Sequence, residues 1–208
     1  MSWYKDLSWQ EKKSVAYIDD EILRKAVIID FEGPKVGDPE LVGYLKDGEF
    51  KTIFLNDSFA SCKSHYNADC MSLDEFSNKI IHDINVEGRF IIGFTSREAD
   101  VLLEFFSGSP VSWYKDAHKY FKKGVFKGRI SKPDGWGLDG ILNYYEIQKT
   151  FYGYQKISGY IQYAKKDLKR KRNYDLITKS AKTKLTKAIN YNREDVNCLF
   201  KAIEMSLE

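Results

Sequence analysis

The sequence predicts an α/β fold with a mixed sheet that begins with three antiparallel strands and is flanked by helices. An apolar run rich in β-branched residues ends in acids, glycine and proline at 26–34, as central strands do. Two further apolar runs flank an Asp-Gly turn, and later segments carry apolar residues at helical spacing. At 208 residues the chain has the length of one domain with its own hydrophobic core.

The three strands are expected close together along the chain. The first lies within the segment 26–34, which ends in acids, glycine and proline. The runs 41–45 and 52–55 are the next two strands, with Asp47-Gly48 in the turn between them. Because Asp-Gly between apolar runs is a strong hairpin signal, these strands are expected to be antiparallel.

Helices and one more strand are expected in the rest of the chain. Apolar residues three and four apart predict a helix over 72–85. The run 89–94 predicts a strand beside the first one, followed by a helix over 95–106. Helical spacing returns at 138–145 and again at 185–203, where it predicts a long C-terminal helix.

We expect a single domain over 1–208, with 1–25 as an N-terminal extension and 107–137 as an irregular insertion without a sustained period. No apolar run approaches the roughly 18–20 residues that a membrane span needs, so no membrane partner is expected. The polar N-terminus does not resemble a secretory signal, which predicts an intracellular, cytoplasmic protein with free thiols. The net charge of +3 is small.

Two pairs of side chains suggest a metal site. Asp30 and Glu32 are two residues apart at the end of a strand, so both carboxylates point to the same face. Tyr191 and Asp195 are four apart on a helix and share one side of it. Oxygen ligands of this kind suit magnesium and manganese. Each pair also has an ordinary structural explanation, as a strand end or as a helix with one buried and one solvated residue.

Together these residues resemble the DEDD exonuclease superfamily, in its branch with a Tyr-x-x-x-Asp motif, over about residues 26 to 204. Asp30-Phe-Glu32 matches the first motif, and Tyr191 with Asp195 matches the last, in the right order. The resemblance implies a ribonuclease H-like fold and a site for two divalent cations, Mg²⁺ or Mn²⁺. It also implies removal of nucleotides from the 3′ end of DNA or RNA, so the expected partner is nucleic acid with single-stranded regions or 3′ ends.

The middle motif departs from the family, which usually has an aspartate after the fourth strand. An ungapped alignment supplies Glu98 there, whereas Asp100 takes the position if the turn is two residues longer. Glu98 also completes a capping box with Thr95, a purely structural role. The expected metal ligands are therefore Asp30, Glu32, Glu98 and Asp195, and Tyr191 is expected to position the attacking water.

A basic stretch suggests contact with phosphates. Ten lysines and arginines lie between positions 165 and 187, including the run 169–172. A solvated helix surface is the alternative explanation. Three functions follow from the sequence: a metal-dependent nuclease, a nucleic-acid-binding module with the same fold and a decayed site, and an unrelated α/β protein such as an interaction domain.

Overall fold

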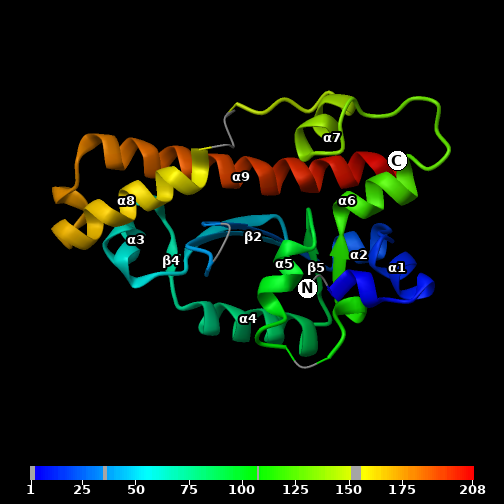
Figure 1. Cartoon of the computed structure of the whole chain (residues 1–208), viewed down its shortest axis with the longest axis horizontal. Helices are drawn as coiled ribbons and strands as arrows, with labels where there is room; N and C mark the ends of the chain where they lie inside the picture. The colour runs from blue at the N-terminus through cyan, green and yellow to red at the C-terminus, as the bar shows by residue number, and fades with distance from the viewer. Residues whose placement is uncertain (1–2, 35–36, 107, 151–155) are drawn as a thin grey trace.

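One mixed sheet forms the centre of the molecule. The computed structural model describes residues 3–34, 37–106, 108–150 and 156–208 (Figure 1). The strands within these ranges are β1 (Ala26–Glu32), β2 (Leu41–Lys46), β3 (Glu49–Phe54), β4 (Asp69–Cys70), β5 (Phe90–Gly93) and β6 (Tyr114–Asp116). They are arranged in the order β4-β3-β2-β1-β5-β6. The predicted α/β class with a mixed sheet is therefore confirmed.

The strand pairing places β1 at the centre of the sheet. β1 pairs antiparallel with β2, and β2 pairs antiparallel with β3, as the hairpin signal predicts. On its other side β1 pairs parallel with β5, which in turn pairs parallel with β6. The short β4 pairs parallel with β3 at the opposite edge.

Helices cover both faces of this sheet. Over the described residues they are α1 (Trp9–Val15), α2 (Asp20–Arg24), α3 (Lys63–Tyr66), α4 (Leu73–Asn85), α5 (Arg97–Leu102), α6 (Ala117–Lys119), α7 (Leu138–Tyr144), α8 (Ile157–Lys171) and α9 (Lys179–Leu207). The long α9 crosses one face with α7 lying outside it, and α4 lies on the other face (Figure 1). None of these helices is both long and apolar enough to cross a membrane.

The two faces of β1 pack into different cores. Ile28 belongs to a cluster with Leu199 of α9, whereas its neighbours on either side pack with Phe76 of α4. Side chains two apart on a strand share a face, so Asp30 and Glu32 point toward α9 like Ile28. Full burial of such an apolar side chain contributes about 1.5–3 kcal/mol. The two cores thus fix which face of β1 carries the acids.

The long, strongly patterned helices lie where the sequence predicts them. Ser72 accepts a hydrogen bond from the backbone N–H of Glu75, whose carboxylate accepts one from the backbone N–H of Ser72, and this capping box begins α4. Thr178 caps α9 by accepting from the N–H of Ala181. The helix expected over 95–106 is shorter in the structure, because α5 ends at Leu102.

The expectation of an irregular insertion over 107–137 is wrong for residues 108–137, the described part of that range, because regular structure is present there. This part contains β6, whose three residues are all buried beside β5. Two of them are charged. Lys115 donates to the carbonyl of Ser14 at 2.9 Å, and Asp116 accepts from the N–H of Lys119 at 2.9 Å. Both charged side chains have hydrogen-bond partners outside β6, and this allows them to be buried. The strand therefore forms without an apolar run in its sequence.

The N-terminal residues pack onto the domain. Val15, Ile18 and Ile22 are buried within the two cores of the sheet. The ammonium of Lys115 in β6 donates a hydrogen bond to the carbonyl of Ser14 in this segment. The first 25 residues, where described, therefore cover part of the domain and do not stand apart from it.

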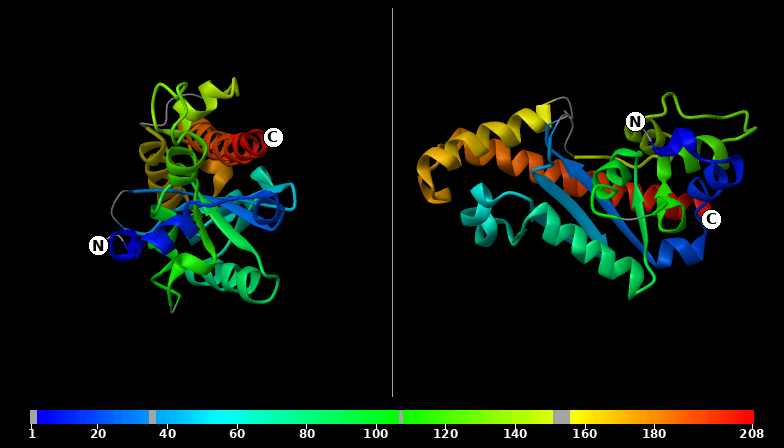
Figure 2. Two further views of the ribbon diagram at one scale, coloured as in Figure 1. Left: turned by 90° about the vertical axis from the view of Figure 1, so that its right-hand side faces the viewer. Right: turned by 60° about the horizontal axis from the view of Figure 1, so that its bottom comes forward.

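Helices α8 and α9 form a projecting pair. The N-terminal half of α9 runs beside α8 away from the sheet (Figure 2). A third core fills the space under them and includes Ile161 and Leu168 of α8 with Leu185 and Ile189 of α9. The basic stretch of the sequence lies on this pair.

Candidate functional site

Three carboxylates from β1 and α9 meet at one place. Asp30, Glu32 and Asp195 each offer an oxygen, and these oxygens lie within 4.8 Å of one another. That spacing allows a single cation to contact all three. The convergence that the family resemblance implies is therefore present, although β1 and α9 are far apart in the sequence.

Close packing between α9 and β2 holds Asp30 in place. Asn192 is buried on α9, and its side-chain N–H group donates to the Asp30 carbonyl at 2.9 Å and to Asp30 Oδ2 at 2.8 Å. Gly43, the β2 partner of Asp30, permits this approach. A Cβ at Gly43 would lie only 2.4 Å from Asn192 Oδ1. A side chain at position 43 would therefore push α9 off the sheet.

Glu98 lies beside the three carboxylates but outside the 4.8 Å group. It is buried at the start of α5, where its Oε2 accepts from the backbone N–H of Thr95 at 3.3 Å and from the hydroxyl of Tyr114 at 3.4 Å. Thr95 Oγ1 accepts from the backbone N–H of Arg97 and not from that of Glu98. Only half of the expected capping box therefore forms, the bond from the Thr95 N–H to the Glu98 carboxylate. Asp100 is exposed. Of the two candidates for the fourth acid, Glu98 is the one at the site.

Burial and mutual repulsion raise the pKa values of these acids. Burial raises the pKa of Asp30 well above its usual range, and the charges of Glu32, Asp195 and Glu98 add to the effect. The pKa of Glu32 rises to about 8, mainly from burial and then from the charge of Asp195. Burial raises the pKa of Glu98 to about 7. A bound divalent cation would relieve both costs, because it replaces lost solvation and separates like charges.

Lys149 provides positive charge at this site. Its side chain is 3% exposed, and its Nζ lies 2.5 Å from Asp195 Oδ1 and 2.7 Å from Asp139 Oδ1. Burial lowers the pKa of Lys149, but the attraction of Asp195 and Asp139 outweighs this and the net direction is upward. Burial also raises the pKa of Asp195, and Lys149 opposes that rise. The Lys149 ammonium thus favours the ionised form of Asp195, while burial keeps the net direction of its pKa upward.

Tyr191 lies over the same carboxylate. Its phenol hydrogen-bonds to Asp195, and its pKa is raised by burial and by the Asp195 charge, so it stays a neutral hydrogen-bond donor. The Lys149 ammonium is 5.1 Å from the centre of its ring. The phenol can therefore donate to Asp195 and accept from a water molecule beside it.

A pocket of about 340 Å³ opens onto these residues. Its polar lining comes from α9, β1 and the start of α7, at Asp30, Asp139, Tyr191 and Asp195. Its apolar lining includes Phe94, Leu138, Val196 and Leu199. A ligand in the pocket would thus have one polar end at the carboxylates and apolar contacts along its body.

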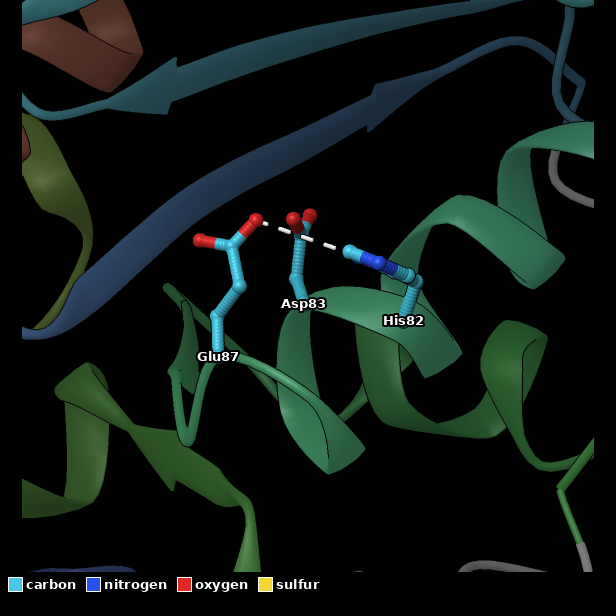
Figure 3. A group of neighbouring side chains, drawn as sticks. All are labelled: His82, Asp83 and Glu87. Atoms are coloured by element: carbon cyan, nitrogen blue, oxygen red, sulfur yellow. Dashed lines mark ion pairs between the residues drawn. The ribbon is translucent and has the colours of Figure 1, made fainter.

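A second group of metal-ligand types lies on the other face of the sheet and is already neutralised. His82, Asp83 and Glu87 are close together at the end of α4 (Figure 3). The ammonium of Lys46 lies 2.8 Å from Asp83 Oδ1 and 2.7 Å from Glu87 Oε1, and Arg89 also pairs with Glu87. The position between the two carboxylates is therefore taken by a lysine, and this group is an ion-pair network.

Sequence reasoning missed three residues of the acidic site: Asn192, Lys149 and Asp139. Asn192 lies within the Tyr-x-x-x-Asp motif, three residues before Asp195, so helical spacing already placed it near that face. Lys149 and Asp139 lie in no pattern that indicates a site. Comparisons of the chain with protein-family models, curated proteins and solved structures gave no match. Its fold and site define it as an α/β protein with a buried acidic centre.

Proposed function

We propose that this chain is a divalent-metal-dependent nuclease, with 3′–5′ exonuclease activity on DNA or RNA and a ribonuclease H-like fold. The observation that carries the proposal is the convergence of Asp30, Glu32 and Asp195 within 4.8 Å. Buried like charges are costly unless a cation compensates them. The order of the elements and the Tyr-x-x-x-Asp spacing, which resemble the DEDD exonucleases, support the same conclusion.

The residues present fit magnesium or manganese. All of the converging groups are carboxylates, and these two cations prefer oxygen ligands. A divalent cation bound there would make a water molecule nucleophilic and stabilise the leaving oxygen of a phosphodiester. Asp30, Glu32 and Asp195 would hold the cation, with Glu98 next to them as the fourth acid. Tyr191 would orient the attacking water through its hydroxyl.

A groove on the α8–α9 pair supports nucleic acid as the substrate. It has a volume of about 400 Å³ and is lined by Tyr160, Lys179, Ser180, Thr183, Lys184 and Lys187. Its three lysines form no ion pair with an acid among the described residues. This basic groove offers ammonium and hydroxyl groups to a phosphate backbone.

At Lys184 the basic groove lies on the same side of α9 as the acidic site. Lys184 precedes Asp195 by eleven residues and Tyr191 by seven, spacings that return to the same side of a helix. At a rise of 1.5 Å per residue, Lys184 and Asp195 are about 16 Å apart along the helix axis. A single strand of a few nucleotides could reach from the groove to the carboxylates.

One observation favours the second candidate function, a nucleic-acid-binding module with a decayed site. Lys149 already pairs with Asp195, so part of the negative charge is neutralised without a metal. Such a module would bind single strands and leave them intact. Cleavage therefore separates the two candidates.

The decisive experiment is incubation of the protein with 5′-labelled single-stranded DNA and RNA in Mn²⁺, Mg²⁺ or EDTA. We expect a ladder of products shortened from the 3′ end in either metal and none in EDTA. A circular single-stranded DNA is the matched control, because an exonuclease leaves it intact. Binding without any cleavage would favour the decayed module, and cleavage of the circle would indicate an endonuclease.

Replacing Lys179, Lys184 and Lys187 by glutamine should weaken binding of single-stranded oligonucleotide. Each lost phosphate contact lowers the slope of log K against log salt by about 0.7 for single strands, so the slope should fall by up to about 2. Fluorescence anisotropy in EDTA measures this slope. The salt concentration is varied between roughly 50 and 200 mM, where binding through phosphate contacts depends strongly on salt.

Two variants complete this experiment. Glutamine at Lys5, Lys12 and Lys13 removes the same charge at the far end of the molecule and should leave the slope unchanged. Glutamine across 169–172, the exposed end of α8, tests whether the strand continues past the basic groove. Equal slopes for the wild type and the groove variant would assign the groove lysines to an ordinary solvated surface.

A further inference from the structure

The ammonium of Lys149 lies between the carboxylates of Asp139 and Asp195. Its Nζ is 2.7 Å from Asp139 Oδ1 and 2.5 Å from Asp195 Oδ1, and its side chain is 3% exposed. A lysine with so little exposure is uncommon unless a paired charge holds it. Its position inside the acidic site therefore needs an explanation in terms of the site.

The charge balance of the site supplies that explanation. Four buried or partly buried carboxyl groups from β1, α5 and α9 interact there: Asp30, Glu32, Glu98 and Asp195. Two cationic side chains act on them. Arg97 and Lys149 both oppose the rise in the pKa of Glu32, and Lys149 also opposes that of Asp195. Asp139, which shares the ammonium of Lys149 with Asp195, is a fifth carboxyl group. One divalent cation together with Lys149 and Arg97 would balance four of these five negative charges.

The positions of the atoms limit where a second cation could bind. Asp139 and Asp195 each use Oδ1 for the same nitrogen. A metal ion shared by these two carboxylates would have to occupy the volume of that ammonium. Asp195 has a second oxygen, so it can pair with Lys149 through Oδ1 and still ligate an ion held with Asp30 and Glu32.

We propose that Lys149 supplies the second positive charge of the acidic site. The substrate-free protein binds a single divalent ion at Asp30, Glu32 and Asp195, and the Lys149 ammonium occupies the place of a second cation between Asp195 and Asp139. Lys149 is a positioning residue, because it fixes and neutralises Asp195. This inference rests on the proposed function and departs from the two ions that the family resemblance implies.

The test is the number of manganese ions bound, measured by calorimetric titration and by electron paramagnetic resonance of free Mn²⁺. We expect one ion in the wild type. In Lys149→Met, Asp139 and Asp195 lose their shared ammonium and should take up a second, weaker ion. Adding Asp139→Asn to that variant removes a ligand of the new site and should return the count to one.

Lys165→Met is the matched control, because Lys165 also pairs with a buried carboxylate, Glu40, which is not one of the proposed metal ligands. Its count should remain one, as should that of Lys149→Arg, which keeps the charge. If Lys149→Met does not fold, the wild-type and Lys149→Arg counts decide. Two ions in either of these, or only one in folded Lys149→Met, would overturn the role of Lys149 and leave the nuclease proposal standing. No bound ion in the wild type would overturn the metal site itself, and this inference with it.

Discussion

Replacing Asp30 by asparagine should abolish metal-dependent cleavage. Asp30 is partly buried at the centre of the acidic site, and the charges of Glu32, Asp195 and Glu98 all act on it. A metal ion contributes several kcal/mol of transition-state stabilisation, so loss of its central ligand should lower kcat/KM by about 100- to 1000-fold. Rates on the labelled oligonucleotide and Mn²⁺ affinity by titration measure the effect.

The same substitution should change the pH dependence of stability in EDTA. In the wild type, carboxyls such as Glu32, with a pKa near 8, hold protons in the folded state that the unfolded state releases above about pH 4.3. Stability therefore falls as pH rises from about 4.3 to 8, by up to about 1.4 kcal/mol per pH unit for each extra proton held. Asp30→Asn removes one of the repelling carboxyls, so its decline should be shallower.

Urea unfolding at pH 5.5 and 8.5, roughly either side of the Glu32 pKa, follows this change. Asp83→Asn is the matched control, because Asp83 is a buried carboxylate that lies in the ion-pair network on the opposite face of the sheet. It should lose stability and keep both Mn²⁺ binding and cleavage. A fully active Asp30→Asn protein would contradict the proposed site.

The sequence predicts those parts of the fold and site that depend on local periodicity. Ser72 and the apolar spacing after it locate α4 closely, and the Asp-Gly turn locates the β2–β3 hairpin. Asp30 and Glu32 are found because side chains two apart share a strand face. Tyr191 and Asp195 are found because residues four apart share a helix face. In each case the signal lies within a few consecutive residues.

The features that sequence reasoning missed depend on contacts between distant segments. The strand β6 is hidden because Lys115 and Asp116 are charged, and it is buried only because Ser14 and Lys119 satisfy them. Lys149 follows α7 in a stretch without periodicity, and its role exists only once α9 brings Asp195 against it. No local pattern encodes such a pairing.

The fourth acid gives the other large expected effect. Changing Glu98 to glutamine should reduce cleavage by orders of magnitude, because Glu98 is buried beside Asp30 and its charge acts on both Asp30 and Glu32. Folding should be preserved, since the glutamine oxygen can still accept from the N–H of Thr95 as Glu98 Oε2 does. Circular dichroism and thermal unfolding check the fold, and the oligonucleotide assay measures the rate.

Asp100→Asn is the matched control for this substitution, since it removes the same charge from the same helix. Two residues along a helix turn the backbone by about 200°, and Asp100 is exposed where Glu98 is buried. Its cleavage rate should therefore stay within about twofold of the wild type, as for most exposed substitutions. Loss of activity in Asp100→Asn but not in Glu98→Gln would mean that Asp100, and not Glu98, is the fourth acid. If neither change matters while Asp30→Asn does, Asp30, Glu32 and Asp195 suffice, and the bond from Thr95 to Glu98 serves only to begin α5.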